Sequence, residues 1–320
     1  MKICVAGASG FIGSAIVGSL KSSEITPLLL VRNKSSAADD LETAEVDLED
    51  LSSFDPEVFN GCDALIHAAA RAHVMKDEAL DPLVEYRRIN CDAALKLAKL
   101  AASAGVRRFV FLSSIKVNGE LTEPRKPFVA DSDYIPDDPY GLSKYEAEKG
   151  LLEIAENNDM EVVIIRPPLV YGPGVKGNFA SMVSWIKKGI PLPFGATHNK
   201  RSLVALDNLV DFIILCARRD KSPKAANEVF LISDGKDIST SELLRKVAKA
   251  YGVKSRLIPI PESWIQFVAK ILGKGDISDR LFGNLQVDSS KAKELLGWNP
   301  VINMDKQLEK IAAFDKSRKE

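Results

Sequence analysis

The chain has 320 residues, a formal net charge of −1 and 46% hydrophobic residues, which is enough for about two domains or one sheet with an added lobe. The near-neutral charge does not favour nucleic acid or an anionic membrane as a partner. Four scattered cysteines and three histidines show no metal-ligand spacing, so we expect no metal site and reduced thiols. The chain opens on a strand and has no membrane-spanning apolar run, which predicts a cytoplasmic protein without stable membrane insertion.

The first predicted element is a dinucleotide-binding turn. An apolar strand, KICVA, leads into GASGFIG, after which a helical pattern begins. Gly7 permits a tight turn, Gly10 lets the backbone approach a pyrophosphate, and Gly13 permits close packing of helix and strand. The start of the helix, with Phe11 and Ile12, would offer unpaired N–H groups to the phosphates. We therefore expect these residues to bind a dinucleotide, and a purely structural glycine turn is the alternative.

The residue after the second strand should select the cofactor. In this type of fold a carboxylate at that place accepts hydrogen bonds from the adenosine ribose. Here PLLLV is followed by Arg32, with Asn33, Lys34, Ser35 and Ser36 behind it. A cation among small polar residues suits a 2′-phosphate, so we expect NADP(H) to be favoured, with NAD(H) possible. The alternative is an exposed arginine that stacks on adenine.

The next two predicted strands should also line the cofactor site. The strand TAEVD ends at Asp47, whose carboxylate could meet the adenine amino group, with Leu48 beside it. Asp47 could equally cap a helix beginning in LEDLSSF. The fourth strand, in GCDALIHAAA, ends with Ala68, Ala69 and Ala70, whose small side chains leave room for a cofactor.

Strands and helices alternate as far as Pro167, which predicts a Rossmann-type, doubly wound parallel α/β sheet with right-handed crossovers. A long helix at about 82–104 precedes the strand VRRFVFLSS. This strand brings Ser113 and Ser114 to the carboxyl edge of the sheet, where ligands bind. A polar, proline-bearing loop at 118–139 follows, and we expect Pro167, at the end of EVVIIRPP, to contact the cofactor.

The helix predicted at about 140–157 carries a candidate acid–base pair. Tyr140 and Lys144 are four residues apart and would share one helix face. A phenol has a pKa of about 10 and transfers protons poorly near neutral pH. An ammonium group one turn away should lower that pKa, and Ser114, or Ser113 beside it, could complete the group. Isolated Tyr-x-x-x-Lys patterns are common in proteins. This one indicates a catalytic pair because a dinucleotide-binding pattern precedes it in the sequence.

The glycine- and proline-rich segment RPPLVYGPGVKGN marks a boundary between a dinucleotide-binding domain, 1–167, and a smaller substrate-binding lobe, 168–320. Some elements of the lobe should return to the first domain. Helices are predicted at about 179–188 and from Asp207 onward. An apolar helix at 264–272 has basic ends that could suggest membrane contact, but packing in the lobe or against another subunit is favoured.

Six motifs stand in the order typical of one enzyme family: GASGFIG, DALIHAAA, FVFLSSIKVNGE, PYGLSKYEAE, RPPLVYGPG and RSLVALDNLVD. Over essentially its whole length the chain resembles the extended short-chain dehydrogenases/reductases, in the branch of nucleotide-sugar epimerases and dehydratases. The resemblance implies that Tyr140 is the acid–base residue, that Lys144 also binds the nicotinamide ribose, and that Ser114 is the hydroxyl partner. It also implies a UDP-sugar substrate and a homodimer through the helices near 82–104 and 140–157.

The same resemblance implies three residues that bind the substrate diphosphate. Asn178 in GPGVKGN and Arg201 at the start of RSLVALDN correspond to diphosphate-binding residues of the family, and a planar guanidinium suits that task. Arg280 is a further candidate. Tyr140 and Ser114 would contact the sugar itself.

Departures from the family pattern reduce the number of candidate reactions. The 4,6-dehydratases carry threonine, aspartate and glutamate where this chain has Ser114, Ile115 and Lys116, so a dehydratase is disfavoured. Asn118 stands in place of the tyrosine of the epimerases' VYG. The segments SSIKVNGE and RSLVALDNLVD look most like a bacterial surface-polysaccharide subgroup. We favour a reductase of a UDP-4-keto-6-deoxy-N-acetylhexosamine. The alternative is a 4-epimerase of UDP-glucose or UDP-N-acetylglucosamine, and a non-catalytic NADP-binding sensor is remote.

Overall fold

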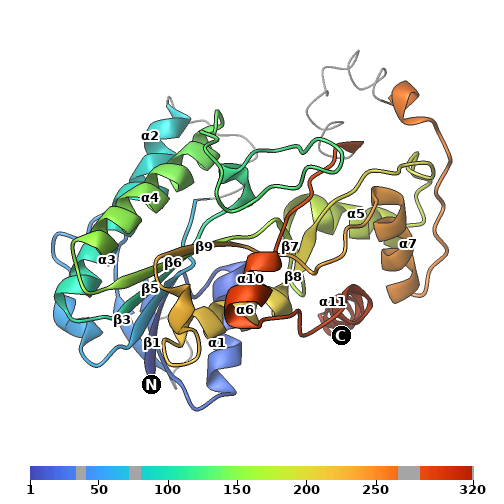
Figure 1. The fold of residues 1–320 in the computed structure, drawn as a ribbon. Helices are drawn as coiled ribbons and strands as arrows, with labels where there is room; N and C mark the ends of the chain where they lie inside the picture. Colours follow the sequence, from blue (N-terminus) through green and yellow to red (C-terminus); the bar gives the residue numbers. More distant parts are fainter. Residues whose placement is uncertain (34–40, 72–80, 266–281, 319–320) are drawn as a thin grey trace.

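The computed structural model describes residues 1–33, 41–71, 81–265 and 282–318. Within these ranges seven parallel strands form one sheet in the order β3-β2-β1-β4-β5-β6-β9 (Figure 1). The strand order reverses between β1 and β4, which is where ligands of doubly wound sheets bind. The predicted fold class is therefore confirmed. The strands are β1 Lys2–Ala6, β2 Thr26–Val31, β3 Glu42–Glu45, β4 Ala64–His67, β5 Arg108–Leu112, β6 Glu161–Arg166 and β9 Glu228–Leu231.

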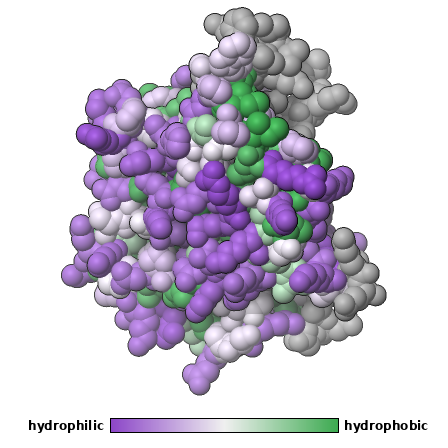
Figure 2. All heavy atoms as spheres, turned by 90° about the vertical axis from the view of Figure 1, so that its right-hand side faces the viewer, coloured by the Kyte–Doolittle hydropathy of each residue, from purple (hydrophilic) through white to green (hydrophobic). Residues whose placement is uncertain are grey.

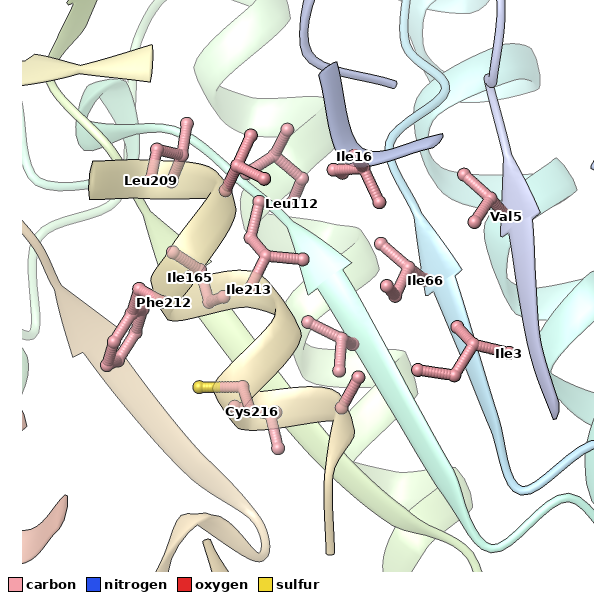
Figure 3. Close-up of a cluster of buried hydrophobic side chains, with 14 of the residues drawn as sticks. Ile3, Val5, Ile16, Ile66, Leu112, Ile165, Leu209, Phe212, Ile213 and Cys216 are labelled. Atoms are coloured by element: carbon pink, nitrogen blue, oxygen red, sulfur yellow. The ribbon is translucent and has the colours of Figure 1, made fainter. Parts of the chain in front are cut away.

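Helices cover both faces of the sheet. Side chains of α1 and α6 pack against one face, and Figure 3 shows Phe212 and Ile213 of α6 beside Ile165 of the sheet. Side chains of α3 and α4 pack against the other face. A sheet covered on both sides needs apolar residues at nearly every strand position, which explains the unbroken apolar runs of the sequence. These helices are α1 Phe11–Lys21, α2 Pro82–Arg87, α3 Ala93–Ser103, α4 Pro139–Glu156 and α6 Leu206–Ala217.

A smaller lobe lies beside this sheet, on the right in Figure 1. Its strands β7 and β8 pair in parallel, and its helices α5, α7 and α11 surround a separate core that includes Tyr171, Phe179 and Leu244. Residues beyond 168 also supply α6 and β9 to the large sheet, so the domain boundary after residue 167 stays a prediction. The elements of the lobe are β7 Leu169–Tyr171, α5 Gly177–Lys187, β8 Leu203–Ala205, α7 Thr240–Ala250 and α11 Met304–Ser317. Helix α10, Ser290–Leu296, packs beside β9 against the core of the large sheet.

The outer side of the lobe is mostly hydrophilic, with apolar residues gathered in the upper half of the view in Figure 2. Trp264, predicted to belong to a packed apolar stripe, is 68% exposed, whereas Ile265 packs against the core of the lobe. The rest of the helix predicted at 264–272 lies outside the described residues. Among the helices that the structure does describe, none is long and apolar enough to cross a membrane.

Three predicted elements differ in the structure. The segment LEDLSSF forms turns instead of a helix, and the Asp47 carboxylate accepts a hydrogen bond from the N–H of Glu49 at 3.0 Å, so the helix-cap alternative is wrong. The helix predicted at 82–104 is interrupted by a π turn, Arg88–Asp92. Helix α6 begins at Leu206, with Ala205 as its N-terminal cap, one residue before the predicted Asp207.

Candidate active site

The glycine turn between β1 and α1 is packed too tightly for side chains. Gly7 has φ +85°, and a Cβ atom on it would lie 2.5 Å from the backbone nitrogen of Ala69. A Cβ on Gly13 would lie 2.0 Å from the carbonyl oxygen of Gly7. The turn therefore lies directly against the end of β4, where the sequence analysis placed Ala68 and Ala70. The glycine turn and the end of β4, both predicted to line the cofactor site, are therefore in contact.

The start of α1 fits the phosphates of a dinucleotide. Gly10 is the N-terminal cap in extended conformation, and no side chain among the described residues caps the helix. The first turn, with Phe11 and Ile12, also contains no acidic residue. Open N–H groups and the positive end of the helix dipole make this position suited to an anion.

Arg32 lies at the expected adenosine end of the site and is 76% exposed. Its guanidinium lies 3.4 Å from a carboxylate oxygen of Glu49, which also binds Arg88. Glu49 follows Leu48 and the exposed Asp47, both predicted to contact the cofactor. Sequence reasoning missed Glu49, because only the fold brings it beside Arg32. Lys34, Ser35 and Ser36 lie outside the described residues.

Helix α4 presents the candidate acid–base pair to the end of β5. Asp138 caps the helix by accepting a hydrogen bond from the Gly141 N–H at 3.1 Å, and Pro139 opens its first turn. Lys144 is fully buried, and its Nζ atom donates to the Leu112 carbonyl at 2.9 Å. Burial lowers the pKa of Lys144 to about 7, against the opposing effects of Glu148 and then Cys91.

The phenol of Tyr140 is hydrogen-bonded to Ser114. Burial raises the pKa of Tyr140 to about 12, although the Ser114 hydrogen bond acts to lower it. The prediction that Lys144 lowers this pKa is therefore wrong for the structure described here. Loss of hydration dominates at Tyr140, and the Lys144 ammonium is directed at the Leu112 carbonyl instead. The phenol is thus a proton donor at neutral pH.

The residues after Ser114 make contacts that stabilise the neighbouring turns and helix. The Ser114 hydroxyl accepts a hydrogen bond from the Lys116 N–H at 3.2 Å and so caps a short 3₁₀ turn, Ile115–Val117. The Lys116 ammonium binds Glu120 at 2.6 Å and Asp138 at 3.2 Å. Lys116 therefore stabilises the N-terminal cap of α4 by binding Asp138. This is a structural role for a residue that departs from the dehydratase pattern.

The expected diphosphate residues lie in the smaller lobe. Asn178 is exposed in the first turn of α5. Arg201 is partly buried, its guanidinium donates to the Gly283 carbonyl at 3.0 Å, and burial lowers its pKa. No hydrogen bond joins Asn178 to Arg201 in the part of the chain that the structure describes, so their joint role stays a prediction. Arg280 lies outside the described residues. Pro167, expected beside the cofactor, accepts a hydrogen bond from the Ile115 N–H at 3.0 Å.

Asn90 is a buried residue of the π turn that sequence reasoning missed. Its side chain accepts from the Arg71 N–H at 2.8 Å and donates to Ser143 at 3.1 Å. It thereby joins the chain after β4 to α4, one residue before Lys144. The sequence period of a helix does not reveal a π turn, so no signal pointed to Asn90.

A parallel sheet with a glycine turn at its switch point and a Tyr–Lys pair at its carboxyl edge defines a class, the dinucleotide-dependent enzymes of the Rossmann type. The model of the "NAD dependent epimerase/dehydratase family" matches residues 3–232. A UDP-glucose 4-epimerase of Vibrio cholerae is 48% identical over 301 residues, which are 93% of this chain and 90% of that protein. The chain therefore belongs to this family and is an enzyme of the extended short-chain dehydrogenase/reductase type, using a nicotinamide dinucleotide.

Solved structures agree on the fold. The UDP-glucose 4-epimerase of Thermotoga maritima, solved with UDP-glucose, covers both chains completely with a TM-score of 0.78 at 23% identity. The UDP-N-acetylglucosamine 4-epimerase of Bacillus cereus covers 98% of both chains with a TM-score of 0.76 at 23% identity. At this level of identity, the likeness shows the fold alone.

Proposed function

We propose that the protein is a 4-epimerase of a UDP-hexose, with UDP-glucose and UDP-N-acetylglucosamine as the first candidate substrates. The observation that carries this proposal is the 48% identity with the UDP-glucose 4-epimerase of Vibrio cholerae over nearly the full length of both chains. The more distant Thermotoga maritima and Bacillus cereus enzymes, whose fold this chain shares, are also 4-epimerases of UDP-sugars.

In this proposal the hydroxyl at C4 of the hexose lies between Tyr140 and Ser114. The dinucleotide supplies the exchange of hydride at C4. Tyr140 takes the proton of the C4 hydroxyl as hydride leaves C4 and returns it to the ketone oxygen as hydride comes back. Its raised pKa of about 12 favours the second, proton-donating half of this cycle. Ser114 shares the hydrogen bond, and Lys144 fixes the end of β5 on which Ser114 stands.

The reductase favoured from the sequence receives less support than the epimerase. One observation still favours it, since an exposed Arg32 stands where a ribose-binding carboxylate is usual. A relative of that chemistry, the dihydroflavonol 4-reductase of Dianthus caryophyllus, is 27% identical over 84% of this chain. The two reactions share the hydride step and the Tyr140 proton, so the same residues would serve either one.

We propose NAD(H) as the resident cofactor, in place of the NADP(H) favoured from the sequence. The Glu49 carboxylate lies 3.4 Å from the Arg32 guanidinium. It therefore adds a negative charge where a 2′-phosphate would lie. A carboxylate at this end of the site can instead accept hydrogen bonds from ribose hydroxyls. The matched family is described as NAD dependent. The homodimer through α2–α3 and α4, which pack side by side in Figure 1, stays a prediction.

Arg32→Ala tests whether this arginine still attracts a 2′-phosphate. We expect the unmodified protein to bind NADH more tightly than NADPH. The substitution should weaken NADPH binding further, about tenfold or about 1.4 kcal/mol, and leave NADH binding within about twofold, because only NADPH carries the phosphate. Titration of both dinucleotides against the purified variant measures this. Arg107→Ala, an exposed arginine paired with Asp63 at 3.7 Å, is the control. Equal loss of both dinucleotides would contradict the proposed place of Arg32.

Arg201→Ala tests the binding of the substrate diphosphate. We expect KM for the UDP-sugar to rise about tenfold or more, since a charge-assisted hydrogen bond is worth about 1.5–3 kcal/mol, while cofactor affinity stays unchanged. Initial-rate kinetics measure KM. Arg245→Ala is a matched control, because Arg245 also donates to a backbone carbonyl of the lobe, that of Gly195, at 3.1 Å. An unchanged KM would remove Arg201 from the site.

Product analysis decides between epimerase and reductase. The purified protein is incubated separately with UDP-glucose, with UDP-N-acetylglucosamine, and with a UDP-4-keto sugar plus NADPH. We expect the C4 epimer of a UDP-hexose to accumulate with no NADPH supplied. Conversion of the keto sugar alone, with equal consumption of NADPH, would instead establish the reductase.

A further inference from the structure

One face of α4 is joined to the end of β5 at three successive turns. Residues four apart along a helix share a face, and positions 140, 144 and 148 follow that spacing. Each of the three side chains reaches a different residue at the end of β5. The contacts are Tyr140 with Ser114, Lys144 with the Leu112 carbonyl, and Glu148 with the Ser113 hydroxyl. The strand end that presents Ser114 is therefore held by the same helix that presents Tyr140.

Glu148, the third of these residues, is buried together with an arginine of β6. Glu148 is 3% exposed and Arg166 is 6% exposed. The Arg166 Nε atom lies 3.0 and 3.2 Å from the two carboxylate oxygens, and its Nη2 atom lies 2.6 Å from one of them. The remaining Arg166 donor, Nη1, binds Asn118 at 3.0 Å and the Ala130 carbonyl at 3.1 Å. The pair is thus fully hydrogen-bonded, and Asn118 belongs to it.

The charge of Lys144 depends on what faces it in the core. From β4, His67 is held neutral, because burial and Lys144 lower its pKa to about 3. From the π turn, Cys91 is held as a thiol, because burial raises its pKa to about 11. From β5 come the Phe111 ring, 4.4 Å from Nζ, and the Leu112 carbonyl. Glu148 is then the carboxylate that acts on the ammonium, and it opposes the effect of burial.

We propose that Glu148 is a positioning residue for the proposed reaction: its carboxylate, held by Arg166, holds Ser113 in place and supplies the negative charge one turn from Lys144 on the same face of α4. The proposal rests on the proposed function for its kinetic consequence, but not for its electrostatic one. Removing the negative charge makes the cation less favourable, so the pKa of Lys144 must fall. Shortening the side chain keeps the charge and disturbs the Ser113 contact instead.

Two substitutions separate these roles. Glu148→Gln keeps an acceptor for Ser113 and removes the charge, whereas Glu148→Asp keeps the charge on a shorter side chain. We expect Glu148→Gln to lower the titration midpoint of Lys144 by about one pH unit or more. The ratio of the kcat of this variant to the kcat of the unmodified enzyme should be lower at pH 8 than at pH 6. Glu148→Asp should keep the original midpoint with a lower kcat at every pH. Glu153→Gln, at an exposed position of the same helix, should change neither.

The midpoint is measured by NMR on protein with isotope-labelled lysine, the Lys144 signal being assigned by its absence in Lys144→Met. This readout needs no turnover, so it stands even if the unmodified enzyme fails to epimerise UDP-hexoses. An unchanged Lys144 midpoint in Glu148→Gln would overturn the proposal. If that variant does not fold, Glu148→Asp decides, because it keeps the charge and changes the contact with Ser113. An unchanged kcat in Glu148→Asp would overturn the positioning role.

Discussion

Tyr140→Phe should lose about 10²–10⁴-fold in turnover while binding the dinucleotide normally, since a positioned proton donor contributes about that much to the rate. The phenol is hydrogen-bonded to Ser114, and its pKa of about 12 makes it the proton donor at neutral pH. Removing one oxygen leaves the ring and its edge-to-face contact with Tyr86 in place. Initial rates of C4 epimerisation and a dinucleotide titration measure the two quantities.

The control for this prediction is Tyr145→Phe, a partly buried tyrosine of the same helix that lies outside the acid–base group. It should keep nearly full activity. A Tyr140→Phe variant with half of the original turnover would contradict the assignment of the proton donor. A parallel loss of dinucleotide affinity would mean that the phenol serves binding instead.

Arg166→Met should destabilise the fold by about 3–5 kcal/mol, because it leaves the buried carboxylate of Glu148 without its cation. It also removes the anchor that joins Asn118 and the Ala130 carbonyl to β6. Chemical denaturation, followed by intrinsic fluorescence and by circular dichroism, measures the change in the free energy of unfolding.

Lys246→Met is the control for this second prediction. It breaks an ion pair with Asp305 whose two side chains are 26% and 50% exposed, so it should cost less than about 1 kcal/mol. Equal effects of Arg166→Met and Lys246→Met would contradict the view that the buried pair holds the end of the sheet.

The sequence predicted those parts of the site that depend on local patterns. Gly7 and Gly13 stand in a turn whose packing excludes a Cβ atom, and Tyr140 and Lys144 share a helix face because of their spacing. Whether a residue binds cofactor or substrate stays a prediction. The parallel sheet followed from unbroken apolar strands alternating with helices, since both of its faces are covered.

Contacts between distant segments could not be predicted in this way. Burial decides the pKa of Tyr140, and burial depends on the assembled fold rather than on the Lys144 four residues away. The pairing of Glu148 with Arg166 joins a helix to a neighbouring strand, and no local pattern predicts that Asn118 binds the same arginine. Likewise, the approach of Glu49 to Arg32 changes the expected cofactor without any local signal.

In the proposed reaction, hydride leaves C4 of a UDP-hexose and returns to the same carbon on the opposite face. The most direct measurement uses UDP-glucose and UDP-N-acetylglucosamine deuterated at C4, incubated with the purified protein and no added cofactor. We expect one of them to be converted to its C4 epimer with the deuterium retained at C4. Loss of the deuterium during epimerisation, or no conversion of either sugar together with NADPH-dependent reduction of a UDP-4-keto sugar, would contradict it.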